Sequence, residues 1–281
     1  MQLSAHAAQA ITRLFEQATG QTLSQERLWR ISTTLTPFCR ARGIADLDQL
    51  ARRIEQGTDP ELSLDMIDAL LNNETSFFRD PAVFDMIADE LLPRLAAARA
   101  EERRLRIWSA ACSSGQEAYS LATLFAEQPE RWQGWRIEIL GTDISRSAVN
   151  RAREGLYSEL EVQRGLTARR LLSFFVLEPA KGWRVRRELS ALVTFARRSL
   201  LGPPPAGGRF DLVLCRNALL YFGKERRSQL LDGLSLAIAA DGALLLGAGE
   251  TLAGLSSRFE PDSVLPTIYR PAIRHGSSNA A

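Results

Sequence analysis

The chain changes its hydrophobic pattern once, near residue 104. Before that point apolar residues recur three or four positions apart, as on one face of a helix, and no strand-like alternation is present. After it, short apolar runs alternate with amphipathic stretches, which is typical of strands and helices that follow one another. The pattern therefore predicts an all-helical N-terminal part and an α/β C-terminal part.

Four helices are expected in the N-terminal part, each bounded by a residue that starts or stops helices. The bounding residues are Gly20 after the first helix, Ser24 before the second, Gly57 after the third and Asp59-Pro60 before the fourth. The second helix is expected to bury Leu28, Trp29 and Ile31 on one face.

Five short apolar runs in the C-terminal part are the expected strands of a parallel sheet that helices cover on both faces. A further run, Thr267–Arg270, is expected to form an antiparallel strand at or near an edge. The arginine-rich segment 155–191 breaks this rhythm, and Trp183–Arg187 alternates like a strand of an exposed hairpin. The five runs are Leu105–Trp108, Ile137–Leu140, Leu192–Phe195, Phe210–Leu214 and Ala243–Leu246.

These patterns divide the chain into a helical domain (1–80), a linker helix (81–104) and an α/β domain (105–275). Segment 155–191 is expected to be a small β subdomain inserted into the α/β domain. Asp80-Pro81 is a typical start for the linker helix, and Pro93 is expected to kink it.

Composition narrows the functional class. Hydrophobic residues make up 45% of the 281 residues and the net charge is only +2, so no polybasic field indicates nucleic acid or a membrane surface. Three scattered cysteines and two histidines predict reduced thiols and no metal site. Without a signal peptide or a membrane-spanning run, the chain is expected to be a cytoplasmic monomer that does not insert into the membrane.

The segment after the first expected strand, residues 109–115, consists of small side chains and is followed by a helix start. Such a loop lets the backbone approach a ligand at the carboxyl end of a sheet. Only Gly115 is glycine there, which disfavours a dinucleotide and suits a cofactor without phosphates, such as S-adenosylmethionine (SAM). Glu117 has two interpretations: the carboxylate of a capping box with Ser114, or a group that faces the cofactor's ammonium.

Two further segments carry candidate polar groups. Asp143 follows the second strand and either accepts hydrogen bonds from ribose hydroxyls or caps the next helix, although Ser145 is an equally good cap. Asn217 and Tyr221 follow the fourth strand, where the alternatives are a turn residue and a core aromatic. This segment lacks the motifs of DNA-base methyltransferases.

Residues 72–80 lie between the two expected domains, a common place for sites. Asn72 or Asn73 can simply end the preceding helix, and Phe77 and Phe78 are expected to be core residues. Arg79 is either a solvated charge or a group that binds an anion.

Taken in order, these motifs resemble the CheR-type chemotaxis receptor glutamate methyltransferases. The resemblance covers most of the chain and departs from the family at Ser199-Leu200, where an Asn-Leu pair is usual, at Ala118, and at Gly247–Glu250, which lacks a frequent histidine. The motifs that carry it are Asn73-x-Thr75-x-Phe77-Phe78-Arg79, Ser109–Ser120, Thr142-Asp143-Ile144, Tyr157-Ser158-Glu159, Phe210–Asn217 with Tyr221-Phe222, and Thr267–Arg270.

The resemblance implies a class I SAM-dependent, Rossmann-like methyltransferase fold that binds SAM and releases S-adenosylhomocysteine (SAH). It also implies that glutamates on the cytoplasmic helices of bacterial chemoreceptors are the substrate. Arg79 and Tyr221 are the catalytic candidates. The residues expected at the cofactor are Asn73, Thr75, Arg79, Glu117, Asp143, Ser199, Leu200, Arg216 and Asn217.

Two alternatives remain beside this interpretation: a methyltransferase of the same fold that acts on another carboxylate or a small molecule, and a non-catalytic SAM or SAH sensor. The arginines between Arg27 and Arg53, and those between Arg169 and Arg198, are either solvated faces or surfaces that attract a glutamate-rich helix.

Overall fold

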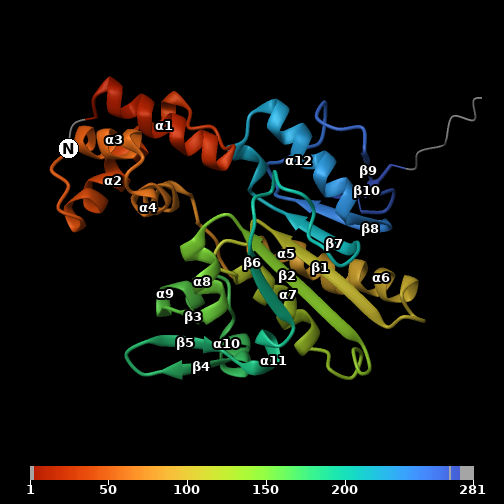
Figure 1. The fold of residues 1–281 in the computed structure, drawn as a ribbon. Coiled ribbons are helices and arrows are strands. Elements are labelled where there is room, and N and C mark those ends of the chain that lie inside the picture. Colours follow the sequence, from red (N-terminus) through yellow and green to blue (C-terminus); the bar gives the residue numbers. More distant parts are fainter. Residues whose placement is uncertain (1–2, 266, 273–281) are drawn as a thin grey trace, which may run out of the picture.

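The structure is a computed structural model that describes residues 3–265 and 267–272. Figure 1 shows three parts: a helical bundle at the upper left, a central sheet with its helices on the right, and a small second sheet at the lower left. The C-terminal end of the predicted α/β domain, residues 273–275, lies outside the described residues. No helix among the described residues is both long and apolar enough to cross a bilayer.

The bundle consists of four α-helices that enclose a hydrophobic core of their own. Gly20 and Gly57 take the left-handed conformation where helices α1 and α3 end, and the Asp59 carboxylate caps α4, as predicted. The helices are α1 (Ala5–Thr19), α2 (Trp29–Ala41), α3 (Leu47–Gln56) and α4 (Pro60–Leu70), with a 3₁₀ turn at Gln25–Arg27.

The second helix differs from its prediction. Ser24 precedes a 3₁₀ turn and its side chain makes no cap, so α2 begins only at Trp29. Trp29 is 64% exposed rather than buried, whereas Ile31 is in the core as expected. A 3₁₀ turn has three residues per turn rather than 3.6. When such a turn precedes a helix, the helix buries a different face from the one that the spacing of apolar residues predicts.

The large sheet has the strand order β6-β2-β1-β7-β8-β10-β9. All five predicted parallel strands are present, and the predicted last strand pairs antiparallel with β8, one position from the edge. The short edge strand β9 was not predicted. The strands are β1 (Arg104–Ala110), β2 (Arg136–Asp143), β6 (Val193–Arg197), β7 (Phe210–Cys215), β8 (Ile238–Leu246), β9 (Phe259–Pro261) and β10 (Ile268–Pro271).

Helices cover both faces of this sheet because its central strands are apolar on both sides. Leu212 and Leu214 of β7 share one core with α5, α6 and α7, while Val213 and Cys215 share the other core with α12. The sheet helices are α5 (Pro81–Met86), α6 (Leu92–Ala98), α7 (Gln116–Ala126), α8 (Arg146–Glu154) and α12 (Lys224–Ala237).

The predicted linker helix is not continuous. A π-helical stretch, Ile87–Leu91, separates α5 from α6 directly before Pro93, so the proline interrupts the helix as expected but through a π turn. Asp80 precedes α5 in a left-handed conformation (φ 61°), and its side chain makes no cap there. The helix therefore starts at Asp80-Pro81 as predicted, but the Asp80 side chain does not cap it.

The insert forms a second sheet in the order β3-β5-β4, and its β4–β5 hairpin contains the predicted strand around Trp183. Gly165 of the insert lies against the Phe77 carbonyl so closely that a Cβ atom would come within 1.7 Å of its oxygen. The insert contains β3 (Leu156–Tyr157), α9 (Glu159–Gln163), α10 (Ala168–Phe174), β4 (Phe175–Glu178), β5 (Gly182–Val185) and α11 (Arg187–Ser190).

The bundle is attached to the sheet through the start of α8. The Asp68 carboxylate of α4 accepts hydrogen bonds from the backbone N–H groups of Arg146 and Ser147, at 2.8 and 3.0 Å. The Arg146 guanidinium reaches back to Glu61 and Asp65. A carboxylate at the positive end of a helix is favourable, so Asp68 completes α8 from outside its own part of the chain.

Candidate active site

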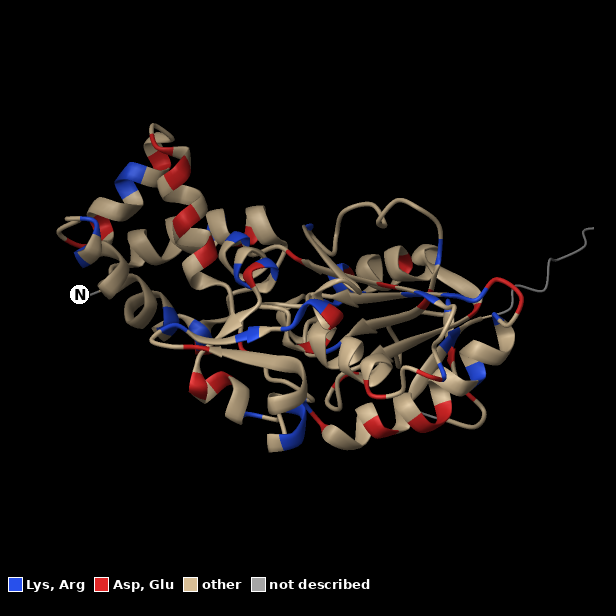
Figure 2. Cartoon of the chain, turned by 90° about the horizontal axis from the view of Figure 1, so that it is seen from below, with Lys and Arg blue, Asp and Glu red and all other residues tan. Residues whose placement is uncertain are grey.

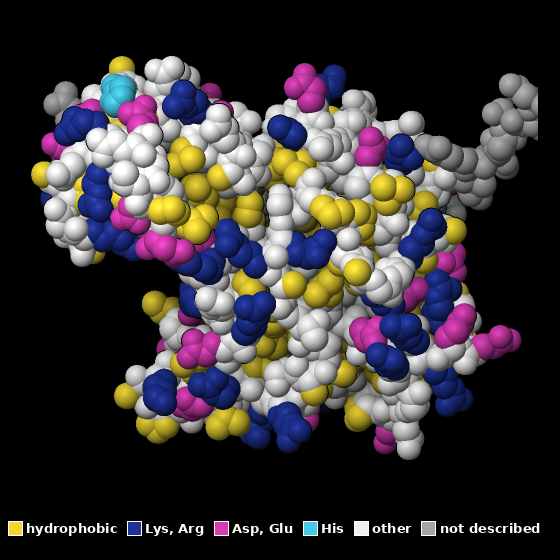
Figure 3. Space-filling view, viewed as in Figure 1, with side chains coloured by type: hydrophobic (Ala, Val, Ile, Leu, Met, Phe, Trp, Pro, Cys, Tyr) yellow, Lys and Arg dark blue, Asp and Glu magenta, His cyan; other side chains and the backbone are white. Residues whose placement is uncertain are grey.

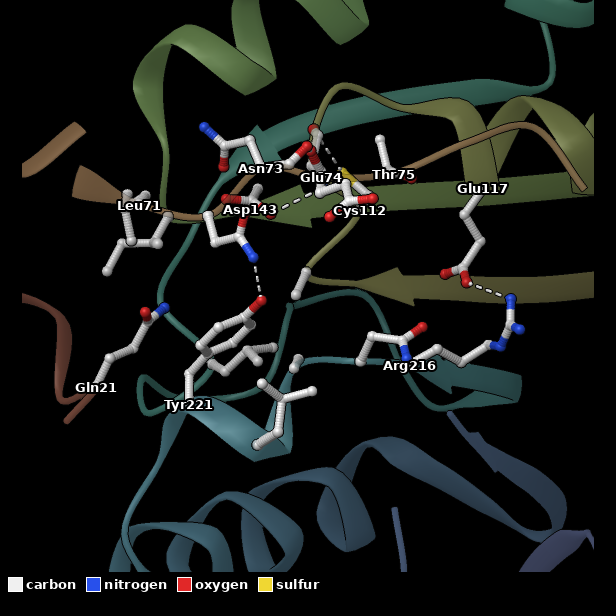
Figure 4. A pocket seen from close by; sticks show the side chains of 18 of the residues that line it. Gln21, Leu71, Asn73, Glu74, Thr75, Cys112, Glu117, Asp143, Arg216 and Tyr221 are labelled. Carbon is white, nitrogen blue, oxygen red and sulfur yellow. Dashed lines mark hydrogen bonds and ion pairs between the residues drawn. The ribbon is translucent and has the colours of Figure 1, made fainter. Parts of the chain in front are cut away.

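A cavity lies beyond the carboxyl ends of β1, β2 and β7, on the side where the bundle joins the sheet (Figure 4). The order β2-β1-β7 makes this edge the switch point of the sheet, where open α/β proteins bind ligands. The cavity encloses about 1060 Å³ of space, its open mouth included. Segments 71–79, 198–200 and 216–222 complete its walls.

The loop between β1 and α7 turns sharply at residues other than glycine. Ala111 (φ 64°) and Ser113 (φ 51°) are both left-handed and both line the cavity. Gly115 is also left-handed, but a Cβ atom there would meet Ala152 and Phe195 rather than a ligand. The glycine is therefore needed for the turn and for packing against α8 and β6.

The capping box predicted for Ser114 and Glu117 is absent. Gly115 occupies the cap position of α7, and the Ser114 hydroxyl donates to the Gln116 side chain. Glu117 instead accepts a hydrogen bond from the Ser109 hydroxyl (2.8 Å) and pairs with Arg216 (3.3 Å). A charged partner close in space has displaced the local backbone bond, so Glu117 remains at the cavity wall.

Arg216 is the central cation of the site, with only 2% of its side chain exposed. It donates to the Asp80 carboxylate (2.6 Å) and to the Arg79 carbonyl (2.9 Å), in addition to Glu117. Its Nε atom is buried and has no hydrogen-bond partner among the described residues. This network joins segment 79–80 to the ends of β1 and β7.

Asp143 lies at the end of β2 and is 8% exposed. Its two carboxylate oxygens accept the backbone N–H groups of Ser113 (2.8 Å) and Ser145 (2.9 Å), and Ser145 caps α8 as the sequence allowed. Burial raises the pKa of Asp143, and the N–H bonds from Ser145 and Ser113 oppose that rise. A carboxylate has about four acceptor sites, so the backbone N–H groups leave part of this capacity for a ligand.

Tyr221 and Arg79 both line the cavity. The Asn72 amide donates a hydrogen bond to the Tyr221 hydroxyl oxygen, so the phenolic proton remains free to be donated. The Arg27 guanidinium lies 5.2 Å from the centre of the Tyr221 ring. The Arg79 guanidinium makes no ion pair or hydrogen bond with any described residue, which leaves it available for an anion.

The structure brings every predicted site residue to this one cavity. Figure 4 shows Glu117 and Arg216 pointing toward one another at one end, and Asp143 and Tyr221 toward the other. Asn217 is left-handed (φ 58°), so it is also the turn residue of the alternative interpretation. The predicted residues in the lining are Asn73, Thr75, Arg79, Glu117, Asp143, Ser199, Leu200, Arg216, Asn217 and Tyr221.

Sequence reasoning missed three contributors. Asn72 was considered only as a helix end, yet its partner is Tyr221, 149 positions away. Asp80 was assigned to a helix cap although it pairs with Arg216, and Gln21 lines the cavity from the bundle. Only the neighbouring motif Asn73-x-Thr75 offered a signal for Asn72, because a long-range pair leaves no trace in local spacing.

The lining fits SAM on chemical grounds. Two carboxylates, Glu117 and Asp143, can accept from an ammonium group and a ribose diol, and the unpaired Arg79 can bind a carboxylate. Within the described part of the chain, no group of histidine, cysteine and acidic side chains has the arrangement to hold a metal ion. Burial raises the pKa of Cys112 well above its ordinary value, so this lining thiol remains protonated.

The sheet and its switch-point cavity are those of a class I SAM-dependent methyltransferase. Residues 73–265 match the model of the CheR methyltransferase, SAM binding domain. The chain therefore belongs to the CheR methyltransferase family, and SAM is its cofactor.

Curated relatives extend the match over nearly the whole chain. A chemotaxis protein methyltransferase of Vibrio parahaemolyticus is 36% identical over 251 residues, which is 89% of this chain and 90% of the relative. Chemotaxis protein methyltransferase 1 of Pseudomonas aeruginosa is 34% identical and covers 95% of this chain and 98% of its own. The Escherichia coli chemotaxis protein methyltransferase is 30% identical, over 89% of this chain and 85% of the relative.

Proposed function

We propose that this chain transfers a methyl group from SAM to glutamate side chains on the cytoplasmic helices of chemoreceptors. The family and its named relatives support this reaction. The observation that supports it most is the free Arg79 guanidinium, which faces the same cavity as the Tyr221 hydroxyl and the carboxylates of Asp143 and Glu117. A substrate on the cytoplasmic part of a receptor also implies a cytoplasmic enzyme.

The cofactor would be held at two ends. Asp143 has free acceptor sites for the two ribose hydroxyls, while Glu117, fixed by Ser109 and Arg216, is suited to the ammonium group. SAM supplies an electrophilic methyl group on a sulfonium when it is bound. Ser199 offers one hydroxyl where the family commonly has an amide, so we expect fewer hydrogen bonds to the adenosine end.

The chain's own task is then to orient an anion rather than to remove a proton. A glutamate side chain is already ionised near neutral pH, since its reference pKa is about 4.3. We propose that the Arg79 guanidinium anchors a carboxylate and that the Tyr221 hydroxyl donates a hydrogen bond to the attacking one. Orientation of this kind can lower a barrier by roughly 7–11 kcal/mol.

Basic side chains near the cavity mouth are suited to a glutamate-rich partner. Arg42 and Arg53 are paired with Asp65 and Asp59, so the net excess between residues 27 and 53 is smaller than the sequence indicates. Figure 3 shows Lys and Arg side chains gathered where the bundle meets the rest of the molecule, above the notch that separates it from the insert. Elsewhere acidic and basic residues are interspersed (Figure 2).

We propose that the helical domain of residues 1–80 docks the receptor, that the helix of residues 81–104 is a linker, and that residues 105–275 with their insert are the SAM-binding methyltransferase domain. The separate hydrophobic core of α1–α4 supports the first of these. The gathering of Lys and Arg side chains where the bundle meets the rest of the molecule supports its contact with the receptor.

Methyl transfer from labelled SAM to receptor-bearing membranes tests the proposed function. Label on the receptor that mild alkali releases indicates a carboxyl methyl ester. Label that appears only on a small molecule, or SAH binding with no transfer to any acceptor, would favour the alternative functions. Receptor in which the accepting glutamates are changed to alanine is the control.

Two variants test the proposed roles. Arg79→Ala and Tyr221→Phe each remove one group that meets the substrate, and a hydrogen bond to a charged group contributes about 1.5–3 kcal/mol. We expect turnover to fall roughly 10- to 150-fold with unchanged melting temperature. Arg131→Ala, on an exposed turn, and Tyr269→Phe, on β10, are the matched controls. Wild-type turnover in both folded test variants would reject these roles.

A further inference from the structure

Glu250 lies behind the cavity wall rather than in it. Among the described residues that line the cavity, Glu250 is absent, yet its carboxylate accepts three backbone N–H groups. One oxygen accepts from Asn217 and Gly247, both at 2.8 Å, and the other accepts from Leu219 at 2.8 Å. A single side chain therefore joins the end of β8 to the segment that follows β7.

Two of these bonds are made to a backbone that is strained or has N–H groups without local partners. Asn217 is left-handed at φ 58°, a conformation that costs a residue other than glycine free energy. Leu219 begins the 3₁₀ turn Leu219–Tyr221, whose first N–H groups have no partner within the turn. The Glu250 carboxylate satisfies both and so fixes the path of residues 217–221.

That path decides where two side chains of the cavity point. Asn217 and Tyr221 are separated by one tight turn, and both line the cavity. Hydrogen bonds from N–H groups to an ionised acceptor are the strong kind, so the carboxylate is well suited to this task. An uncharged amide in its place would present an NH₂ group to at least one of the three donors.

We infer that Glu250 is a positioning residue, which sets Asn217 toward the cofactor and Tyr221 toward the substrate by holding residues 217–221 from behind. This inference rests on the proposed function for the meaning of the two side chains. The hydrogen bonds themselves can be tested without any reaction.

Two substitutions disturb the carboxylate by different routes. Glu250→Gln removes the charge and one acceptor oxygen. Gly247→Ala leaves Glu250 intact, but its new Cβ would meet both the Asn217 nitrogen and the Glu250 oxygen at 2.8 Å. Gly249→Ala, whose Cβ meets nothing within 4 Å, and Glu260→Gln, at an exposed carboxylate, are the matched controls.

Backbone hydrogen exchange of the peptide that covers residues 216–222 is the first measurement, and it needs no substrate. We expect exchange at Asn217 and Leu219 to become at least tenfold faster in Glu250→Gln and Gly247→Ala, and to remain at the wild-type rate in both controls. Unchanged exchange in the two test variants overturns the inference, whether or not the wild-type protein methylates a receptor.

A double-mutant cycle on turnover is the second measurement. If Glu250 acts through Tyr221, Glu250→Gln combined with Tyr221→Phe should lower kcat little more than the more severe single change, because the two changes remove one contribution. The KM for SAM should rise less than kcat falls. Fully additive losses would show that Glu250 does not act through Tyr221 and would overturn that step. Absence of methyl transfer in the wild type would reject the proposed function instead.

Discussion

Asp143→Asn is the most direct test of how the cavity holds its cofactor. The carboxylate already accepts the N–H groups of Ser113 and Ser145, and its remaining acceptor capacity is available to a ligand in the cavity. An amide has only one oxygen. Whichever way it turns, its NH₂ group faces one of the two backbone donors, and one of the ribose hydroxyls loses its acceptor.

The magnitude follows from this count. A hydrogen bond to a charged group contributes about 1.5–3 kcal/mol, and each 1.4 kcal/mol changes a dissociation constant about tenfold. Loss of one such bond should therefore weaken SAH binding by roughly 10- to 150-fold. The backbone donor left without an acceptor is present with and without ligand, so it lowers the stability by about 1–3 kcal/mol rather than the affinity.

Calorimetry with SAH measures the affinity, and thermal unfolding measures the stability cost separately. Burial raises the pKa of Asp143, so the free protein holds a proton there at pH values where an ordinary carboxyl is ionised. The ionised form accepts the hydroxyls, so affinity should rise with pH from about 4 until the carboxyl is fully ionised. Asp143→Asn should abolish this rise.

Asp89→Asn, at an exposed carboxylate of the π-helical stretch, is the control. An unchanged dissociation constant in folded Asp143→Asn would refute the ribose-binding role of this residue. A pH dependence of the affinity that persists in the variant would show that another group causes it.

Three further outcomes follow from the structure. Burial raises the pKa of Asp262, but the hydrogen bonds from Arg270 and Arg94 lower it more, to well below its ordinary value. Asp262→Asn should therefore lower the free energy of unfolding by about 3 kcal/mol at neutral pH. In acid unfolding curves, the difference between variant and wild type should vanish as the pH falls below about 4 toward the folded-state pKa. Gly165→Ala should lower the free energy of unfolding, measured in urea, by more than about 2 kcal/mol, because both its φ of 99° and the Phe77 carbonyl oppose a Cβ atom. Gly57→Ala is the control: its φ is 65° and a Cβ atom there meets open space, so it should cost only about 1–2 kcal/mol. Initial rates on receptor should fall steeply between 50 and 300 mM salt, on the order of tenfold, while SAH affinity changes little; equal salt dependence of both would count against an arginine-lined docking surface.

The sequence predicted most elements whose cause is local. Gly20 and Gly57 end helices because no side chain opposes the left-handed conformation, and Asp59 caps α4 with its own carboxylate. The central strand β7 was found because both of its faces are buried, which leaves an apolar run without alternation. β9 was missed because its three residues are too short for any pattern.

The candidate site was predicted as a set of residues, but their contacts were not. Glu117 has the spacing of a capping box, and only the fold brings Arg216, 99 positions later, close enough to compete for its carboxylate. Asp80 likewise has the sequence of a helix cap and the geometry of an ion-pair partner. In each case the carboxylate forms a stronger, charge-assisted interaction with a buried cation than with a local N–H group. The position of that cation depends on the whole sheet.

Gly115 shows a different limit of sequence reasoning, because nothing in the sequence indicated a reason for a glycine at this position. Its missing side chain faces Ala152 and Phe195, away from the cavity. A single sequence shows that a small residue is needed at a position, but it does not show which neighbour requires it.

The Asp68 carboxylate links the helical bundle to the α/β domain, so the two cannot be separated or exchanged independently. It completes the first turn of α8, and the Ser145 hydroxyl and Asp143 carboxylate lie on the approach to that turn. Residues 73–265, the span of the family model, begin five residues after Asp68 and exclude it. We expect a truncated or chimeric enzyme that keeps only that span, or that takes its N-terminal helices from a relative without an acid at this point, to have a loosened nucleoside site, even though every lining residue from Asn73 onward is retained.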